Sequence, residues 1–224
     1  MSRKKPAASA KRRVFLVDDH PIVIAGFTQM LNAQPDLELC GVAMSAEEAV
    51  GLIAAAVPEL IITDITLPGR NGLELIKDIA TINPGLSVLV VSMHDEMLYA
   101  ERALRAGARG YLMKEAGAER MLAAIRHVLS GKVYVSERMQ AKILNAMSGR
   151  NPRGSGSPLE RLSDREFEIF RLLGEGHSTK EIASQLHLSH KTVAVHRGHI
   201  KEKLGITSAA ELMHRAVRWV NAQG

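Results

Sequence analysis

Five short apolar runs, each followed by an amphipathic segment, place the tightest limit on the fold of this chain. The runs lie at 14–17, 39–43, 60–63, 88–91 and 111–113, and their length is typical of buried strands. Helical spacing of apolar residues follows at 21–33, 46–57, 72–82, 96–106 and 118–129. Five such repeats predict an α/β fold, a doubly wound five-stranded parallel sheet of the flavodoxin-like type, because parallel strands need helical crossovers.

The rest of the chain shows only helical patterns, at 164–173, 179–186, 191–204 and 209–220. The turn at 187–189 joins two of these helices with helix-turn-helix spacing. We therefore expect a second, all-α four-helix domain. Helix-start signals of the S-x-x-E type and helix-stop glycines support these ends. The start signals are Ser45 with Glu48, Ser163 with Glu166 and Ser178 with Glu181, and the stop glycines are Gly174 and Gly205.

Composition along the chain divides it into four predicted parts: a basic disordered tail at 1–11, the sheet domain at 12–131, a helix and flexible linker at 132–158, and the helical domain at 159–224. The stretch 148–158, SGRNPRGSGSP, has no large apolar residue. Residues 14–147 carry 16 acidic against 11 basic groups, whereas residues 158–224 carry 10 basic against 8 acidic groups. An acidic domain suits a cation, and a basic one suits a polyanion.

Several classes of protein are excluded at this stage. No run reaches about 18 apolar residues, so a transmembrane helix is not expected. The first residues, MSRKKPAASAKRR, are basic but lack the apolar core of a secretory signal. A single cysteine, Cys40, cannot build a disulfide framework. We expect a soluble cytoplasmic protein without a membrane partner.

Polar residues gather where the predicted strands end. Asp18 and Asp19 follow the first strand, Asp64 the third and Ser92 the fourth, and Lys114 closes the fifth. The carboxyl ends of parallel strands meet at one edge, so three carboxylates should lie together and need a cation, for which hard oxygen ligands favour Mg²⁺. A divalent ion would let Asp64 attack phosphorus, with Lys114 and Ser92 holding phosphoryl oxygens.

The local sequences VDDH (17–20), TDITLPGRNG (63–72), VVSMH (90–94) and GYLMKE (110–115) resemble the receiver domain of bacterial two-component response regulators. The resemblance implies that Asp64 is the phosphoacceptor, served by a histidine kinase. It implies that Asp18, Asp19, Asp64 and the backbone carbonyl of Thr66 organise Mg²⁺. Ser92 and Tyr111 would be the switch pair, with Tyr111 rotating into the space that Ser92 leaves, and Lys114 would bind phosphate. Glu115 departs from the proline that many receivers place there.

The helix predicted at 191–204 should bury Val193, Ile200 and Leu204 and turn its opposite side to DNA, in the manner of a recognition helix in a major groove. Ala194 and Val195 would contact thymine methyl groups. Arg197 would either reach DNA or pack against the first helices of the domain. We expect His196 to be buried or packed and His187, His190 and His214 to lie on the surface, with no metal cage among the six histidines. The candidate DNA-contacting residues are Lys180, Lys191, Thr192, Ala194, Val195, Arg197, Gly198 and Lys201.

The segments LSDREFEIFRLLGEG (162–176) and STKEIASQLHLSHKTVAVHRGHIKEKLGI (178–206) resemble the LuxR-type helix-turn-helix. A receiver joined to this module is similar to the NarL/FixJ type of transcriptional regulator. The resemblance implies a homodimer on a double-stranded DNA operator, formed upon activation and supported by the last helix, with RNA polymerase as a further partner.

The sequence thus predicts a DNA-binding regulator controlled by phosphorylation of Asp64, and not an enzyme. One alternative is a regulator that ignores phosphorylation and keeps a vestigial receiver. A second is a phosphatase with Asp64 as nucleophile, although haloacid-dehalogenase-type enzymes need D-x-D after the first strand. A third is a helix pair that binds only protein. The basic tail would touch DNA phosphates if it takes part in binding.

Overall fold

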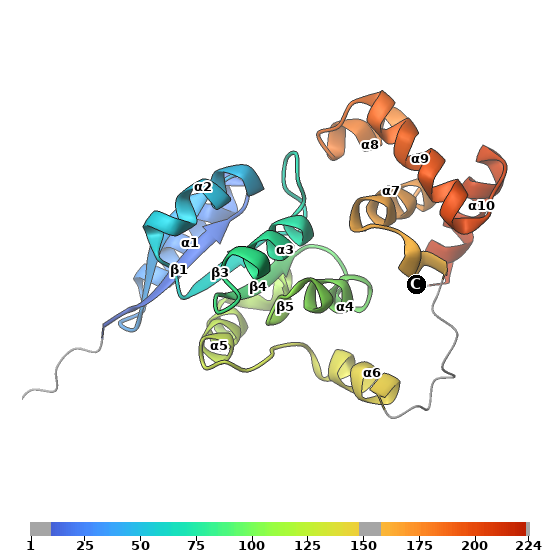
Figure 1. Cartoon of the computed structure of the whole chain (residues 1–224). Coiled ribbons are helices and arrows are strands. Elements are labelled where there is room, and N and C mark those ends of the chain that lie inside the picture. The colour runs from blue at the N-terminus through green and yellow to red at the C-terminus, as the bar shows by residue number, and fades with distance from the viewer. Residues whose placement is uncertain (1–9, 148–157, 223–224) are drawn as a thin grey trace, which may run out of the picture. The chain divides into compact units, whose positions relative to one another are not determined.

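The first half of the chain folds into the predicted five-stranded parallel sheet, in the order β2-β1-β3-β4-β5 (Figure 1). The structure is a computed structural model that describes residues 10–147 and 158–222. It divides into two compact units, Met1–Ser136 and Glu137–Gly224. Most of the predicted tail and linker lies outside the described residues. The strands are β1 (Arg12–Val17), β2 (Leu37–Ala43), β3 (Leu60–Thr63), β4 (Ser87–Ser92) and β5 (Gly110–Met113).

Helices cover both faces of this sheet, which explains why the strands are apolar runs rather than alternating patterns. On one face, Phe27 and Ile125 belong to a core that includes Leu16 and Ile62 of the strands. On the other face, neighbouring helices pack side by side, α2 with α3 and α3 with α4. The helices are α1 (Pro21–Asn32), α2 (Ala46–Ala56), α3 (Gly72–Ile82), α4 (Glu96–Ala106) and α5 (Gly117–Leu129).

Strand register brings the chain segments of the predicted site to one edge. Val17 pairs with Thr63, Thr63 with Val90, and Val90 with Tyr111. The strands β1 and β3 therefore end level with each other, and β4 and β5 run about two residues further. The chain adds β2 on one side of β1, and then β3, β4 and β5 on the other side. The strand order therefore reverses between β1 and β3, which is where ligands bind in folds of this type.

The first strand begins two residues before the apolar run at 14–17. Arg12 and Arg13 open β1, within the predicted sheet domain, and form ion pairs. Arg12 Nε lies 2.6 Å from Glu59 Oε2, and Arg13 Nη1 lies 2.6 Å from Glu38 Oε1. These ion pairs link the start of β1 to β2 and to the residue before β3.

The second unit is helical, and its last four helices begin and end within one residue of the bounds that the sequence predicted. It contains α6 (Glu137–Met147), the 3-10 turn η2 (Pro158–Arg161), α7 (Asp164–Gly174), α8 (Thr179–Gln185), α9 (His190–Leu204) and α10 (Ala209–Asn221). Val193, Ile200 and Leu204 are buried on α9, as its pattern predicted. None of the described helices is both long and apolar enough to span a membrane.

The helix-start signals at α7 and α8 are confirmed as reciprocal capping boxes, in which each serine caps a backbone N–H and each glutamate caps the serine. The signal at α2 is only half right. Ser45 accepts a hydrogen bond from the Glu48 N–H, but the Glu48 carboxylate accepts from the backbone N–H of Met44, at 2.7 Å. Gly205 ends α9 in the left-handed region, as expected, with φ 65°.

Gly174 was predicted to stop α7, and this interpretation was wrong. Gly174 is the last residue of the helix, and the left-handed residue after it is Gly176, with φ 89°. A Cβ on Gly174 would lie 2.5 Å from the carbonyl oxygen of Ala216 and 2.6 Å from Val220 Cγ2. The absence of a side chain therefore lets α7 and α10 approach closely.

We predict that Gly174→Ala destabilises the helical unit by about 1–3 kcal/mol, because the new methyl group must push α10 away. Gly198→Ala is the matched control, since nothing lies within 4 Å of a Cβ there, and it should stabilise α9 by about 0.5–1 kcal/mol. The measurement is urea unfolding followed by the fluorescence of Trp219, the single tryptophan of the chain, which packs on Phe167 and Phe170. Equal stability of the two variants would contradict the packing argument.

Candidate functional site: an acidic sheet edge and an exposed helix

Three carboxylates, a lysine and a serine meet at the carboxyl edge of the sheet, as the sequence predicted. Asp18 and Asp64, each the residue after its strand, are 2% and 4% exposed, and Ser92, the last residue of β4, is 1% exposed. Such burial is costly for two carboxylates of like charge unless hydrogen bonds and a cation compensate them. Their partners therefore decide what this edge can do.

Asp64 has partners at both oxygens. Its Oδ1 accepts hydrogen bonds from the Ser92 hydroxyl at 2.7 Å and from the backbone N–H groups of Ile65 at 2.5 Å and Thr66 at 3.3 Å. Its Oδ2 accepts from Lys114 Nζ at 2.7 Å. Asp64 is thus held in one orientation. Backbone N–H groups and Ser92 hold its Oδ1, whereas its Oδ2 faces the flexible side chain of Lys114.

Lys114 bridges the two buried carboxylates. Its Nζ lies 2.6 Å from Asp18 Oδ2 and 2.7 Å from Asp64 Oδ2. Burial alone would lower the pKa of Lys114, but the charge of Asp64 and its hydrogen bonds to Asp18 and Asp64 outweigh burial and hold that pKa above its usual value. Lys114 stays protonated and supplies the positive charge that the edge requires.

Asp19 is the carboxylate that the lysine does not reach. Its Oδ1 is buried, and no donor among the described residues reaches it with hydrogen-bond geometry. His20 Nδ1 lies 2.8 Å from it and forms an ion pair with it only when the imidazole is protonated. One oxygen each of Asp18 and Asp19 and one His20 nitrogen lie within 4.8 Å of one another. A carboxylate oxygen without a hydrogen bond, beside a second carboxylate, fits a hard divalent cation such as Mg²⁺.

Gly72 belongs to this site, although sequence reasoning gave it no role. It begins α3, and a Cβ there would lie 1.9 Å from the backbone oxygen of Asp64. Its N–H donates to the carbonyl of Ile65 at 2.8 Å. The start of α3 therefore holds the loop that carries Asp64, and only glycine permits this approach. The sequence signal that could have indicated this role is a glycine eight residues after Asp64, at the end of the segment TDITLPGRNG.

The two residues of the predicted switch pair, Ser92 and Tyr111, are both buried. The Ser92 hydroxyl bonds Asp64, and Tyr111 is fully buried with its hydroxyl donating to the His94 carbonyl at 2.8 Å. Burial raises the pKa of the Tyr111 hydroxyl far above its usual value, so this donor stays protonated. Rotation of Tyr111 into space left by Ser92 stays a prediction, since Ser92 itself lies against Asp64.

In the second unit, side chains fix α9 to each of its helical neighbours. Lys203 Nζ lies 2.6 Å from Glu166 Oε2 on α7, Arg197 Nη1 donates to the Thr179 hydroxyl on α8 at 2.6 Å, and Arg215 of α10 donates to the carbonyl of Leu204 at 3.1 Å. Of the two alternatives for Arg197, the structure shows the packing one. These contacts fix the orientation of α9 relative to α7, α8 and α10.

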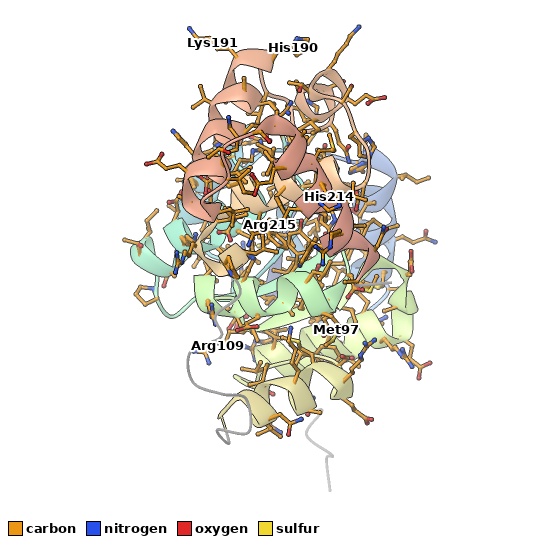
Figure 2. The ribbon with its side chains drawn as sticks, turned by 90° about the vertical axis from the view of Figure 1, so that its right-hand side faces the viewer. Met97, Arg109, His190, Lys191, His214 and Arg215 are labelled. Carbon is orange, nitrogen blue, oxygen red and sulfur yellow. The ribbon has the colours of Figure 1, made fainter. Side chains whose placement is uncertain are left out.

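The remaining candidate DNA contacts lie on or beside the outer side of α9. Lys191 stands at its N-terminal end, and its side chain extends away from the ribbon together with His190 (Figure 2). Val195 is 48% exposed. The Thr192 hydroxyl lies 2.8 Å from that of Ser189, the residue that caps α9. Ala194, Gly198 and the α8 residue Lys180 are also exposed, whereas Lys201 is half-buried.

The histidines of this unit differ partly from expectation. His187, His190 and His214 are exposed, as predicted, and His196 is half-buried. His196, His199 and Glu166 of α7 nevertheless bring one ligand atom each within 4.8 Å of one another, a grouping that sequence spacing did not reveal. Lys203 already lies against this carboxylate. Burial raises the pKa of Glu166, but the hydrogen bond and charge of Lys203 and the hydrogen bonds of Ser163 together outweigh it and hold that pKa below its usual range. The ammonium of Lys203 therefore already pairs with the Glu166 carboxylate.

Comparison with known protein families matches both units. The response regulator receiver domain matches residues 14–126, and the domain of bacterial regulatory proteins of the luxR family matches residues 160–216. Among curated relatives, the oxygen regulatory protein NreC of Staphylococcus carnosus (strain TM300) is 34% identical over 92% of this chain and 97% of its own length. NreC of Staphylococcus aureus (strain MRSA252) is 35% identical over the same shares.

Solved structures give the same answer. RcsB from Salmonella enterica serovar Typhimurium, bound to promoter rprA in the presence of the phosphomimetic BeF₃⁻, matches with a TM-score of 0.59 and 26% identity over 91% of this chain and 97% of that one. A LuxR-family two-component response regulator from Aurantimonas sp. SI85-9A1 matches with a TM-score of 0.57 and 30% identity, over 62% of this chain and 99% of that one. The chain belongs to the two-component response regulators of the NarL/FixJ type, transcriptional regulators rather than enzymes, which join a receiver domain to a LuxR-type DNA-binding domain.

Proposed function

We propose that Asp64 accepts a phosphoryl group from a histidine kinase and that this modification strengthens binding of the chain, as a dimer, to an operator. The observation that carries the proposal is the geometry around Asp64. A buried carboxylate is oriented by Ser92 and two backbone N–H groups, and Lys114 faces its other oxygen. In the transfer, a carboxylate oxygen of Asp64 forms a bond to phosphorus while the bond from phosphorus to the kinase imidazole nitrogen breaks.

We further propose that Asp18, Asp19, Asp64 and the backbone carbonyl of Thr66 hold Mg²⁺. The buried Asp19 oxygen without a hydrogen bond supports this assignment. When bound, the ion would offset negative charge on the transferring group. Lys114 would then hold a phosphoryl oxygen as a point charge, and Ser92 would donate its hydroxyl to another.

For the second unit, we propose that α9 enters the major groove and that Lys180 and Lys191 contact phosphates. Both lysines are exposed near helix N-terminal ends, where backbone N–H groups also favour phosphate. Ala194 and Val195 present small apolar surfaces to base edges. RcsB, a structural relative, is described bound to promoter DNA and as dimers on DNA, which supports a dimer here. We propose a cytoplasmic location, because that is where a bacterial regulator meets its operator. An activating output would add RNA polymerase as a partner.

Incubation of the full chain with Mg²⁺ and acetyl phosphate should add a single phosphoryl group, an increase of about 80 Da in intact mass. Asp64→Asn should remove this adduct, because the amide nitrogen is not a nucleophile. Asp95→Asn is the control, since Asp95 is an exposed residue that caps α4, and the adduct should persist in that variant. An adduct that survives Asp64→Asn would contradict the assignment.

Lys114→Met should destabilise the first unit by about 3 kcal/mol, because two buried carboxylates lose their shared cation. Mg²⁺ should then stabilise the variant more than it stabilises the wild type, since the site becomes more negative. Lys132→Met, at an exposed lysine of the same unit, is the control. The measurement is urea unfolding by circular dichroism with and without MgCl₂. If Mg²⁺ stabilises all three proteins equally, the acidic edge does not hold the ion.

Lys191→Ala should weaken DNA binding uniformly across sequences and reduce the slope of log K against log[salt] by about 0.9, the value for one lost phosphate contact. The fold should be unaffected, because the side chain extends from the end of α9. Fluorescence anisotropy at several salt concentrations gives the slope, with Lys132→Ala as the control. An unchanged slope for Lys191→Ala would remove this lysine from the proposed DNA surface.

A further inference from the structure

His94 is the point where three parts of the receiver meet, and neither the proposed phosphoacceptor chemistry nor the Ser92–Tyr111 pair uses its side chain. It lies in the loop between β4 and α4, two residues after Ser92. Its ring Nε2 lies 2.8 Å from the hydroxyl of Thr66, in the loop after Asp64. Its ring stacks on Tyr99 of α4, with centroids 4.8 Å apart and planes 24° apart. Its backbone carbonyl accepts the Tyr111 hydroxyl of β5 at 2.8 Å.

We propose that His94 is a positioning residue that couples the Asp64 loop to Tyr99 and Tyr111. This inference rests on the proposed phosphorylation of Asp64 and adds a second route to the one through Ser92. The backbone N–H of Thr66 donates to Asp64 Oδ1 at 3.3 Å, so a change of charge at Asp64 acts on Thr66 directly. The hydrogen bond between the Thr66 hydroxyl and the His94 ring transmits any shift of that loop to the segment before α4.

The two tyrosines make the coupling specific. Tyr99 is 1% exposed, so the imidazole that stacks on it cannot move without disturbing the packing of α4. Tyr111 is fully buried, and its hydroxyl needs an acceptor at that depth, which the His94 carbonyl supplies. Rotation or translation of His94 therefore alters α4 and β5 together.

The test uses the full chain labelled with 3-fluorotyrosine. The chain has three tyrosines, Tyr99, Tyr111 and Tyr134, so three ¹⁹F resonances can be assigned by single Tyr→Phe changes. Phosphoramidate with Mg²⁺ supplies the phosphoryl group, and intact mass gives the extent of modification. In the wild type, the Tyr99 and Tyr111 resonances should shift on phosphorylation, and Tyr134 should shift less.

His94→Phe keeps a flat ring against Tyr99 but removes the nitrogen that meets Thr66. We expect this variant to be phosphorylated while the Tyr99 and Tyr111 shifts fall to less than half of the wild-type values, and the gain in DNA affinity should fall about two- to tenfold, the worth of one hydrogen bond. His94→Gln, whose amide can take the position of the ring Nε2, should restore part of the Tyr111 shift. Thr66→Val combined with His94→Phe should add nothing beyond His94→Phe, because both changes remove the same bond.

His127→Phe is the matched control. His127 also contacts a tyrosine, with its ring 5.7 Å from that of Tyr134, but it lies in the last turn of α5. This variant should respond as the wild type does. If phosphorylated His94→Phe shows the same tyrosine shifts as the wild type, the role of His94 is wrong, while the proposed function stands. Failure of His94→Phe to accept the group, with Tyr99 and Tyr111 resonances unchanged before modification, would also overturn it. A wild type without an adduct would instead overturn the proposed function.

Discussion

The ammonium of Lys114, held between the buried carboxylates of Asp18 and Asp64, is the interaction on which the receiver site depends. Three parallel strands deliver these groups to one edge, and the strand order places β1 and β3 side by side there. Without a cation, the two carboxylates could not both stay ionised at this depth. The same charge excess that requires Lys114 makes the edge receptive to a divalent ion and, with it, to a phosphoryl group.

The helical unit depends on a different constraint, the fixing of α9 by its neighbours. Lys203, Arg197 and Arg215 use their charges within the unit, on Glu166, on Thr179 and on the carbonyl of Leu204. The basic groups that remain exposed at the N-terminal ends of α8 and α9 are Lys180 and Lys191. The outer side of α9 carries small residues, and Lys180 of α8 and Lys191 of α9 lie near the N-terminal ends of their helices. This surface suits close approach to DNA better than binding of an apolar partner.

Elements with strong periodicity could be predicted from the sequence, and the candidate site followed from where the strands end. The runs around Leu16, Ile62 and Val90 are buried on both faces, so no other element fits them. What could not be predicted depends on packing between distant segments. Gly174 looked like a helix stop because its contact with Ala216 lies 42 residues away in the sequence. Arg197 could not be assigned before Thr179 was placed, and the inward position of Tyr111 depends on the His94 carbonyl.

The central claim is that charge at Asp64 in one unit alters DNA affinity in the other. The most direct measurement is the dissociation constant for a duplex enriched by the full chain from a random library, with and without phosphoramidate and Mg²⁺, for the wild type and Asp64→Asn. The account predicts about tenfold tighter binding for the phosphorylated wild type, a coupling of ordinary size, and no change for Asp64→Asn. Equal affinity of the wild type in both conditions, or the same gain in Asp64→Asn, would contradict it.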